Sequence, residues 1–511
     1  MIVKDAPQKD LNMVSGRLVE SFCYPHPVTE RTVLETHISW VVLTGDYAYK
    51  IKKPVNFGFV DYTTLQRRKQ FCEREVELNR RFAADLYLGV VPVIRSGDRT
   101  LIGDFSLDEV EGEIIDYAVK MKQFPQSAIV ASRLDDPGLT KKSFEQFARY
   151  LADFHGRIES VIPTQSFVQT QQILDDAADN FHVLLDPLSE NPRFETLKRL
   201  EKWTSTKGNQ LREKFERRLH DGKVKRCHGD LHLKNIIQLD GQLLAFDGIE
   251  FNEQFQCVDV LSEVAFPVMD LFARDRRDLA WRLLNAYLEA TGEYADLDVL
   301  LYYLVYRAMV RAKVAWLNPG NHSESRRQEY APASNPDDPC AGPWDKYLAV
   351  ANYLATELSP RLAITHGFSG SGKSTVALEV IDNEGGIRIR SDVLRNKFAA
   401  QFKVQDKYSA EMSNWIYTSL VEFARDAIAA RLPVIIDATF LKADRRRPFR
   451  ELALEQNVPF EIIHCEADFN ELCSRLRSRK NDPSEADVNV LRKQLQLHDP
   501  LTVEELTFVR P

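Results

Sequence analysis

The chain has little cysteine, no excess of basic residues and no long apolar run, and each shortage excludes a class of protein. Its 511 residues include only seven cysteines. They are dispersed and form no C-x-x-C pair, which argues against a disulfide framework or a cysteine zinc site. Lysine and arginine total 67 against 75 acidic residues, for a net charge of −8. This balance argues against a protein that binds nucleic acid through bulk charge.

Targeting and membrane signals are also missing from the sequence. No stretch approaches the roughly 18 apolar residues of a membrane helix, and residues 1–14 lack a basic region followed by an apolar run. We therefore expect a cytoplasmic protein without a membrane partner. The composition, 44% hydrophobic and 28% charged, is that of a globular protein, and the length exceeds one ordinary compact core.

Composition and periodicity divide the chain into two expected domains. Residues 318–343 are crowded with Pro, Asn, Ser, Asp and Gly, which predicts a mobile loop. Apolar residues at helical spacing over 344–358 then close a first domain, residues 1–358. The remaining residues, 359–511, form a second domain, and the whole negative net charge falls in the first.

The two domains differ in predicted secondary structure. Strand-like runs over 36–43 and 47–53, joined by a short turn, indicate a hairpin. A helix over 66–86 follows, and helical patterns dominate from residue 141. In the second domain strands and helices alternate, which predicts a parallel sheet covered by helices. We expect an α+β first domain and an α/β second domain.

The most specific motif opens the second domain. Residues 367–374 match G-x-x-x-x-G-K-[ST] after an apolar strand and before a helix, the context of a phosphate loop. Its glycines let backbone N–H groups curl around a phosphate, Lys373 reaches the terminal phosphates, and the Ser374 hydroxyl can hold Mg²⁺. The predicted ATP-binding residues are Gly367, Phe368, Ser369, Gly370, Ser371, Gly372, Lys373, Ser374 and Thr375.

Two later strands of this domain deliver acidic residues to the edge where α/β sheets bind ligands. After the strand 387–390 comes Asp392, placed to accept the proton of an attacking hydroxyl, with Arg395 one helical turn further. A helix N-cap explains the position of Asp392 equally well. The strand 434–437 ends in Asp437, which suits the ordering of Mg²⁺ or its water shell.

Basic residues of the second domain have two readings. Arg475 and Arg479 are four apart, so they share a helix face that suits a clamp on the migrating phosphoryl group. A solvated helix face is the alternative. A basic run nearby also has two interpretations: it contacts a nucleic-acid backbone, or it is a solvated helix face. That run comprises Lys442, Arg445, Arg446, Arg447 and Arg450.

On these motifs, residues 359–511 resemble the small P-loop kinases grouped with phage polynucleotide kinase, zeta toxins and gluconate kinases. The resemblance implies a P-loop NTPase fold in which Asp392 is the general base and Arg395 positions the acceptor. It also implies that Arg475 and Arg479 form a lid. Polynucleotides, sugars and nucleotide sugars all remain open as acceptors.

A second constellation lies in the first domain. Asp230 and Asn235 are five residues apart, and Asp247 follows a strand-like run. Such a trio can accept the proton of a hydroxyl at Asp230 and hold Mg²⁺ at Asn235 and Asp247. Upstream, Lys50 on a strand and Glu75 on the next helix have the arrangement that holds a lysine against the α and β phosphates of ATP.

Some of these assignments stay open at the level of sequence. Lys52 shares the strand face of Lys50, and Glu73 competes with Glu75. Glu250 adds another acidic group close to Asp247. No glycine-rich loop precedes Lys50, so a nucleotide site there would lack that phosphate cradle.

The order and spacing of this constellation, with the helix that ends at His155, resemble the aminoglycoside phosphotransferase family over about residues 30–358. That resemblance implies a bilobal protein-kinase-like fold. The whole chain resembles bacterial fusions of such a domain with an ATP-binding P-loop domain. We therefore expect an ATP- and Mg²⁺-dependent phosphotransferase acting on the hydroxyl of a small-molecule or nucleotide-type acceptor.

Two other functions compete with this expectation. In the first, the chain is a regulatory protein in which one domain senses ATP and gates the other. In the second, it is a kinase of nucleic-acid 5′ ends, which the negative net charge does not favour.

Overall fold

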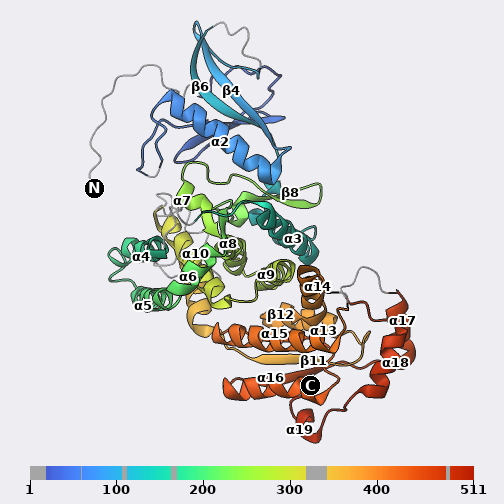
Figure 1. Ribbon diagram of the computed structural model, residues 1–511. Helices are drawn as coiled ribbons and strands as arrows, with labels where there is room; N and C mark the ends of the chain where they lie inside the picture. The colour runs from blue at the N-terminus through green and yellow to red at the C-terminus, as the bar shows by residue number, and fades with distance from the viewer. Residues whose placement is uncertain are drawn as a thin grey trace. The chain divides into compact units, whose positions relative to one another are not determined.

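The computed structural model describes residues 19–58, 60–105, 112–162, 170–317, 342–404, 406–478 and 484–510. The chain divides into two compact units (Figure 1). The first comprises residues up to 136 together with 226–258, and the second comprises residues 137–225 together with those from 259 onward. The loop predicted over 318–343 lies outside the described residues, apart from its last two positions.

The first unit is built on a six-stranded antiparallel sheet, in the order β1-β2-β3-β6-β4-β5. Its strands are β1 (Thr32–Glu35), β2 (Ser39–Leu43), β3 (Tyr47–Lys52), β4 (Tyr87–Ser96), β5 (Arg99–Ile102) and β6 (Glu113–Lys122). The pair β2–β3 is the predicted hairpin. Helix α2 (Leu65–Ala83) packs against β4 and β6 and buries Cys72 and Val76 there. The predicted helix over 66–86 is thus confirmed within a few residues.

Short elements complete the first unit. They are η1 (Gln126–Ala128), η2 (Val130–Ser132), η4 (Leu233–Asn235), β8 (Ile236–Leu239), β9 (Gln242–Ala245) and α7 (Glu253–Gln256). Strands β8 and β9 pair antiparallel around Asp240 and Gly241, whose φ angles are 48° and 77°. Positive φ at both central residues is what a two-residue hairpin turn requires. Strands β7 (Val224–Arg226) and β10 (Cys257–Asp259) lie where the chain passes between the units.

Helices dominate the first part of the second unit. They are α3 (Lys141–Arg157), α4 (Thr170–Leu185), α5 (Phe194–Gln210), α6 (Arg212–His220), α8 (Val260–Phe272), α9 (Arg277–Thr291), α10 (Leu297–Leu317), α12 (Asp345–Asn352) and the π-helical η6 (Tyr353–Glu357). Helix α10 packs against α4, α8 and α12 because its apolar residues cover most of its circumference. Among the helices that the structure describes, none has the length and apolar character needed to span a bilayer.

A four-stranded parallel sheet, in the order β12-β13-β11-β14, forms the rest of the second unit. Its strands are β11 (Leu362–His366), β12 (Ile387–Arg390), β13 (Val434–Asp437) and β14 (Phe460–His464). The helices that alternate with them or follow them are α13 (Lys373–Glu384), α14 (Ser391–Phe402), α15 (Ala410–Ala429), α16 (Ala443–Glu455), α17 (Phe469–Ser478), α18 (Val488–Leu497) and α19 (Val503–Leu506). The predicted parallel α/β sheet is confirmed, as is the mixed antiparallel architecture of the first unit.

Helix α9 packs on α13 and β12 (Figure 1). Helices that the sequence places in a first domain therefore share one compact unit with the parallel sheet. The predicted boundary between residues 358 and 359 falls in the connection from η6 to β11, and as a boundary between independent domains it stays a prediction.

Candidate active site

The phosphate loop joins β11 to α13. Gly367, Gly370 and Gly372 have φ angles of 145°, 88° and 91°, values that residues with side chains rarely adopt. A Cβ atom on Gly367 would lie 2.3 Å from the carbonyl oxygen of Cys465, so only glycine fits that position. The loop therefore curls its backbone over the N-terminus of α13, the arrangement by which proteins bind phosphates.

Lys373 is the first residue of α13, and its side chain lies inside this curl. Its Nζ donates a hydrogen bond of 2.6 Å to the carbonyl oxygen of Phe368 and lies 3.5 Å from the Ser371 hydroxyl. The lysine is buried, so its charge is directed at the loop rather than at bulk solvent. This is the placement that the motif predicts.

A cavity of about 570 Å³ opens beside the loop. Six of the predicted ATP-binding residues line it, namely Ser369, Gly370, Gly372, Lys373, Ser374 and Thr375. The other predicted residues in its wall are Asp392, Arg395, Asp437 and Arg475. The fold thus brings together side chains that the sequence spreads from Ser369 to Arg475. Arg479 lies outside the described residues.

Asp392 lies in the first turn of α14, where its carboxylate faces the cavity. The N-cap of this helix is Arg390, and no side chain caps it, so the alternative that Asp392 is an N-cap is wrong. Arg395, one turn further, is buried. Its Nη1 donates to the carbonyl oxygen of Lys407 at 2.8 Å, and its guanidinium lies 5.3 Å from the Tyr408 ring centroid. These contacts fix its orientation at the cavity wall.

Asp437 ends β13 with a buried carboxylate oxygen that lacks a donor. The residue is 5% exposed, and its Oδ2 accepts no hydrogen bond from the part of the chain that the structure describes. Arg390 Nε and Arg388 Nη1 lie 3.7 and 3.9 Å from it, beyond hydrogen-bond distance. Such an oxygen fits a divalent cation or its water shell. The Ser374 hydroxyl lines the same cavity, so the two predicted Mg²⁺ ligands suit one ion.

Arg475 comes from α17 and contacts the phosphate loop directly. Its Nη1 donates to the carbonyl oxygen of Gly370 at 3.2 Å, and it forms an ion pair with Glu471 on its own helix. About half of the side chain is exposed. Arg475 is therefore held at the loop yet able to turn toward a phosphoryl group.

The basic run on and before α16 is largely paired within the protein. Arg446 is only 1% exposed, and its guanidinium donates to both carboxylate oxygens of Glu505, at 2.6 and 2.9 Å. A solvated face is thus wrong for this residue. The other pairs are Lys442 with Asp499, Arg445 with Asn414, and Arg450 with Glu504. Three of these residues, Lys442, Arg446 and Arg450, thereby anchor the C-terminal segment.

In the first unit, two lysines of β3 share one buried carboxylate. Lys50 Nζ lies 2.9 Å from Glu75 Oε1, and Lys52 Nζ lies 2.7 Å from Glu75 Oε2. Lys50 also forms an ion pair with Asp247, and Lys52 forms one with Glu250. The alternation of β3 puts both lysines on the face toward α2, as predicted.

Exposure distinguishes the competing assignments. The Lys52 side chain is completely buried, whereas that of Lys50 is 11% exposed and contacts Asp247, whose side chain is 43% exposed. Lys50 is therefore the lysine beside the accessible carboxylate. Glu73 is 56% exposed and lies near Lys69, so Glu75 rather than Glu73 is the partner of the strand lysines.

Charge balance keeps this network ionised. Burial opposes the charge on Lys50, but Asp247, Glu75 and Glu250 outweigh it and raise the pKa of Lys50 well above its ordinary value. Burial likewise opposes the charge on Glu75, yet Lys50 and Lys52 lower the pKa of Glu75 below its ordinary value. At neutral pH the carboxylate and both ammonium groups are therefore charged.

The segment from His228 to Asp247, which carries the predicted base and metal residues of the first domain, is held together by hydrogen bonds within it. Asn235 Nδ2 donates to the backbone oxygen of Asp230 at 2.9 Å and to its Oδ2 at 3.3 Å. His228 Nε2 lies 2.8 Å from the carbonyl oxygen of Phe246. Asp247, the next residue, has a left-handed φ of 61°. The predicted base and metal residues of the first domain thus lie in one connected segment of the first unit.

Sequence reasoning missed several supporting residues. In the first unit, Tyr62 donates to Glu250 Oε1 at 2.6 Å, and Asn79 Oδ1 accepts from the N–H of Gly248 at 2.7 Å. In the second unit, Gln494 binds the phosphate loop at Ser369. The one available signal is the spacing of Asn79, which lies one helical turn after Glu75 on the same buried face of α2.

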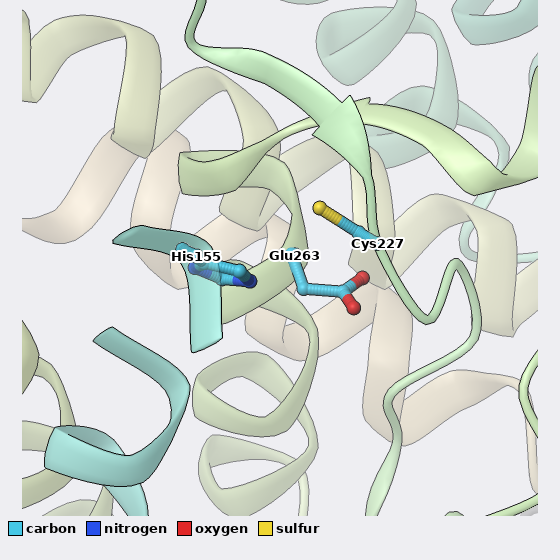
Figure 2. Close-up of side chains that lie close together, drawn as sticks. All are labelled: His155, Cys227 and Glu263. Carbon is cyan, nitrogen blue, oxygen red and sulfur yellow. The ribbon is translucent and has the colours of Figure 1, made fainter. Parts of the chain in front are cut away.

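His155, at which the sequence predicts the end of a helix, is buried in the last turn of α3, which continues to Arg157 in the second unit. Figure 2 shows its imidazole on α3 and the Glu263 carboxylate on α8; the cysteine drawn with them belongs to the first unit. His155 Nδ1 lies 2.8 Å from the Tyr287 hydroxyl. Burial, with a smaller contribution from Lys225, lowers the pKa of His155 to about 3. The imidazole is therefore neutral and structural.

Comparison with known proteins supports the α/β domain that contains the phosphate loop. The family model AAA_33, described as an AAA domain, matches residues 362–501, which span the phosphate loop and the parallel sheet. The predicted P-loop domain is thus confirmed. Along its length the chain is 27% identical, over 483 residues, to the uncharacterized protein Rv2004c of Mycobacterium tuberculosis, covering 92% of this chain and 91% of that protein. A protein of Mycobacterium bovis matches equally.

Similar solved structures divide between the two parts of the chain. A sugar kinase from Janibacter is 24% identical and covers 29% of this chain and 82% of its own, with a TM-score of 0.24. A choline/ethanolamine kinase family protein from Mesorhizobium loti is 12% identical and covers 64% of this chain and 93% of its own, with a TM-score of 0.34. A thermostable mutant of an aminoglycoside phosphotransferase is 12% identical and covers 65% of this chain and 95% of its own, with a TM-score of 0.38. Because these TM-scores are low, the fold assignment rests on the strand order and helices described above.

Proposed function

We propose that this chain is an ATP- and Mg²⁺-dependent phosphotransferase whose phosphate-loop site transfers the terminal phosphoryl group of ATP to a hydroxyl acceptor. The observation that supports this proposal is one cavity of about 570 Å³ shared by the phosphate loop, Asp392, Arg395, Asp437 and Arg475. A phosphate cradle, a base, a metal carboxylate and arginines make up the set that phosphoryl transfer needs.

On the nucleotide side of the cavity, residues would bind the phosphates, hold Mg²⁺ and stabilise the migrating phosphoryl group. The loop amides and Lys373 would bind the phosphates, and Ser374 with Asp437 would hold Mg²⁺. When bound, Mg·ATP supplies the transferable phosphoryl group and the positive charge that offsets its oxygens. Arg475, fixed at the loop by Gly370, would stabilise the negative charge that spreads over the migrating group.

The acceptor side is formed by Asp392 and Arg395. The Asp392 carboxylate would take the proton of the acceptor hydroxyl as its oxygen attacks. Arg395 would orient the acceptor, since its own orientation is fixed by Lys407 and Tyr408. The acceptor is proposed to be a small molecule or a nucleotide-type alcohol, because most of the basic run that would follow a nucleic acid is engaged in internal pairs.

We also propose a second nucleotide site in the first unit. Lys50, paired with Glu75, would hold the α and β phosphates, and Asn235 with Asp247 would hold Mg²⁺. Asp230 would accept the acceptor proton there. If this site binds nucleotide without transferring phosphate, it is instead the sensor of the regulatory alternative.

A transfer assay tests these assignments. The full chain is incubated with γ-labelled ATP, Mg²⁺ and panels of sugars, nucleotide sugars, oligonucleotides and aminoglycosides, in parallel with Lys373→Ala, Asp392→Asn and Asp230→Asn. We expect label on a small-molecule acceptor and its loss in the Lys373 and Asp392 variants. Retained transfer in Asp230→Asn would make the first unit a sensor. Absence of ATP uptake by the wild-type chain in calorimetry, with Mg²⁺ present, would overturn the proposal.

A further inference from the structure

Helix α9 reaches the phosphate-loop site through a pair of arginines on β12. Glu289, near the C-terminal end of α9, accepts one hydrogen bond on each carboxylate oxygen. Arg388 Nη2 donates to Oε2 at 3.0 Å, and Arg390 Nη1 donates to Oε1 at 3.1 Å. Both arginines are largely buried, and their spacing puts them on the same face of the strand. One glutamate thus holds two buried positive charges.

The same arginines lie beside the carboxylate proposed to hold the metal. Arg390 pairs in register with Asp437 of the neighbouring strand β13. Arg390 Nε is 3.7 Å from Asp437 Oδ2, and Arg388 Nη1 is 3.9 Å from it. Arg388 Nη1 instead donates to the backbone oxygen of Ser374 at 3.2 Å. Two guanidinium groups therefore stand between two carboxylates and hydrogen-bond to Glu289, while Asp437 Oδ2 is left without a donor among the described residues.

Asn285, one helical turn before Glu289, fixes this arrangement through the backbone. Its Oδ1 accepts from the N–H of Arg388 at 2.6 Å, and its Nδ2 donates to the carbonyl oxygen of Gly386 at 2.8 Å. Strand β12 is at the edge of the sheet, where outward backbone groups need partners. The buried amide supplies them, so α9 and β12 keep a fixed register, and Glu289 meets the arginines at a set position.

We propose that Glu289 is a positioning residue that keeps Arg388 and Arg390 beyond hydrogen-bond distance of Asp437 Oδ2 and so leaves this oxygen available to the divalent cation. The proposal rests on the proposed function of the phosphate-loop site. Without the charge on Glu289, Asp437 is the carboxylate already within 4 Å of both guanidinium groups. A direct hydrogen bond from either guanidinium to Asp437 Oδ2 would compete with the cation for the same oxygen.

This role gives the helical segment a part in the chemistry of the phosphate loop. Glu289 and Asn285 lie outside residues 362–501, the segment that the AAA family model covers. They come from a helix that the sequence places in the first domain. A helix outside the matched segment would thus help to position the proposed metal ligand, and a shift of α9 along β12 would change the affinity for the cation.

The test measures metal binding rather than turnover. Mn²⁺ is titrated into the full chain with ADP present, and free Mn²⁺ is followed by its electron paramagnetic resonance signal. We expect Glu289→Gln to weaken Mn²⁺ binding about ten-fold, the size of one charge-assisted hydrogen bond. The affinity for ADP in EDTA, measured by calorimetry, should stay within about two-fold of wild type. In transfer assays the KM for Mg²⁺ should rise while kcat at saturating Mg²⁺ is retained.

A matched control comes from the same helix contact. Asp382 of α13 accepts from Arg282 of α9 and from Lys141, both at 2.8 Å, and it does not line the cavity. Asp382→Asn loosens the contact without freeing Arg388 or Arg390, so its Mn²⁺ affinity should match wild type. If both variants lose Mn²⁺ affinity equally, Glu289 acts only as a structural contact between α9 and β12, and the proposal is overturned.

Second-site rescue separates competition from misfolding. In the Glu289→Gln background, Arg390→Gln removes one competing cation and should restore most of the lost Mn²⁺ affinity. No recovery, with unfolding temperatures equal to that of the single variant, would also overturn the proposal. Failure of the proposed function has a different signature. In that case wild type binds Mn·ADP, and the variants behave as stated, yet no acceptor is labelled.

Discussion

Gln494 and Ser369 are joined by two hydrogen bonds of 3.0 Å. The Ser369 N–H donates to Gln494 Oε1, and Gln494 Nε2 donates to the Ser369 hydroxyl. Helix α18 thereby holds the phosphate loop from outside the motif. A loop whose amides are already aimed at the phosphates spends less free energy on ordering when a nucleotide binds.

Loss of this brace should weaken nucleotide binding. For Gln494→Ala we expect the Kd for ADP to rise about five- to ten-fold, the effect of about one hydrogen bond to the loop. Calorimetric titration of the full chain measures it. Lys493→Ala is the matched control, because the neighbouring lysine is exposed on the same helix. If the two variants bind ADP with the same Kd, the hydrogen bonds between Gln494 and Ser369 do not contribute to nucleotide affinity.

Asp392 should matter to turnover and not to nucleotide affinity. A general base contributes in the transition state, typically about 10²- to 10⁴-fold, so Asp392→Asn should lower kcat by that order. The Kd for ADP should remain near that of wild type, whereas Lys373→Ala should raise it. Steady-state kinetics and calorimetry on the two variants make the comparison. A large loss of ADP affinity in Asp392→Asn would assign this residue to nucleotide binding instead.

The local parts of the molecule are the ones that sequence could predict. The phosphate loop, the hairpin β2–β3 and the alternation of β11 to β14 each depend on neighbours in the chain. Strand β4 was not predicted, because Gly89 and Pro92 interrupt its apolar run and such residues ordinarily mark a break or an edge. In the structure β4 is an interior strand, and its pairing with β6 is irregular between Tyr87 and Gly89.

Partners far apart in the chain escaped prediction for a different reason. Glu289 and Arg388 have no motif that relates them, and Arg446 reads as part of a basic helix face until Glu505 is placed beside it. Which charged side chain becomes buried depends on how the helices pack. The spacing of residues along the sequence does not contain that information. The sequence pointed to the residues proposed to contact the nucleotide and acceptor more readily than to the residues that hold those side chains in place.

The buried carboxylate of Glu75 should be a large contributor to the stability of the first unit. Glu75→Gln leaves Lys50 and Lys52 buried with less compensating charge, and breaking a buried pair typically costs about 3–5 kcal/mol. We expect a clear fall in the free energy of unfolding, measured by chemical denaturation with a probe in the first unit. Glu73→Gln, on the same helix but 56% exposed, should change it by less than about 0.5 kcal/mol. Similar losses in both variants would contradict the buried network.

His155 should make stability depend on pH in mildly acidic solution. The folded protein keeps this imidazole neutral, because burial and Lys225 lower its pKa from 6.5 to about 3, whereas the unfolded chain takes up a proton near the ordinary value. Between these two values the unfolded state binds more protons, so the free energy of unfolding falls as the pH decreases, by up to about 1.4 kcal/mol per pH unit. His155→Gln, which can still hydrogen-bond to the Tyr287 hydroxyl, should flatten this slope between pH 6.5 and 5. His182→Gln, at an exposed position, should leave it unchanged. A variant at position 155 with the wild-type slope would show that the imidazole is protonated in the folded protein.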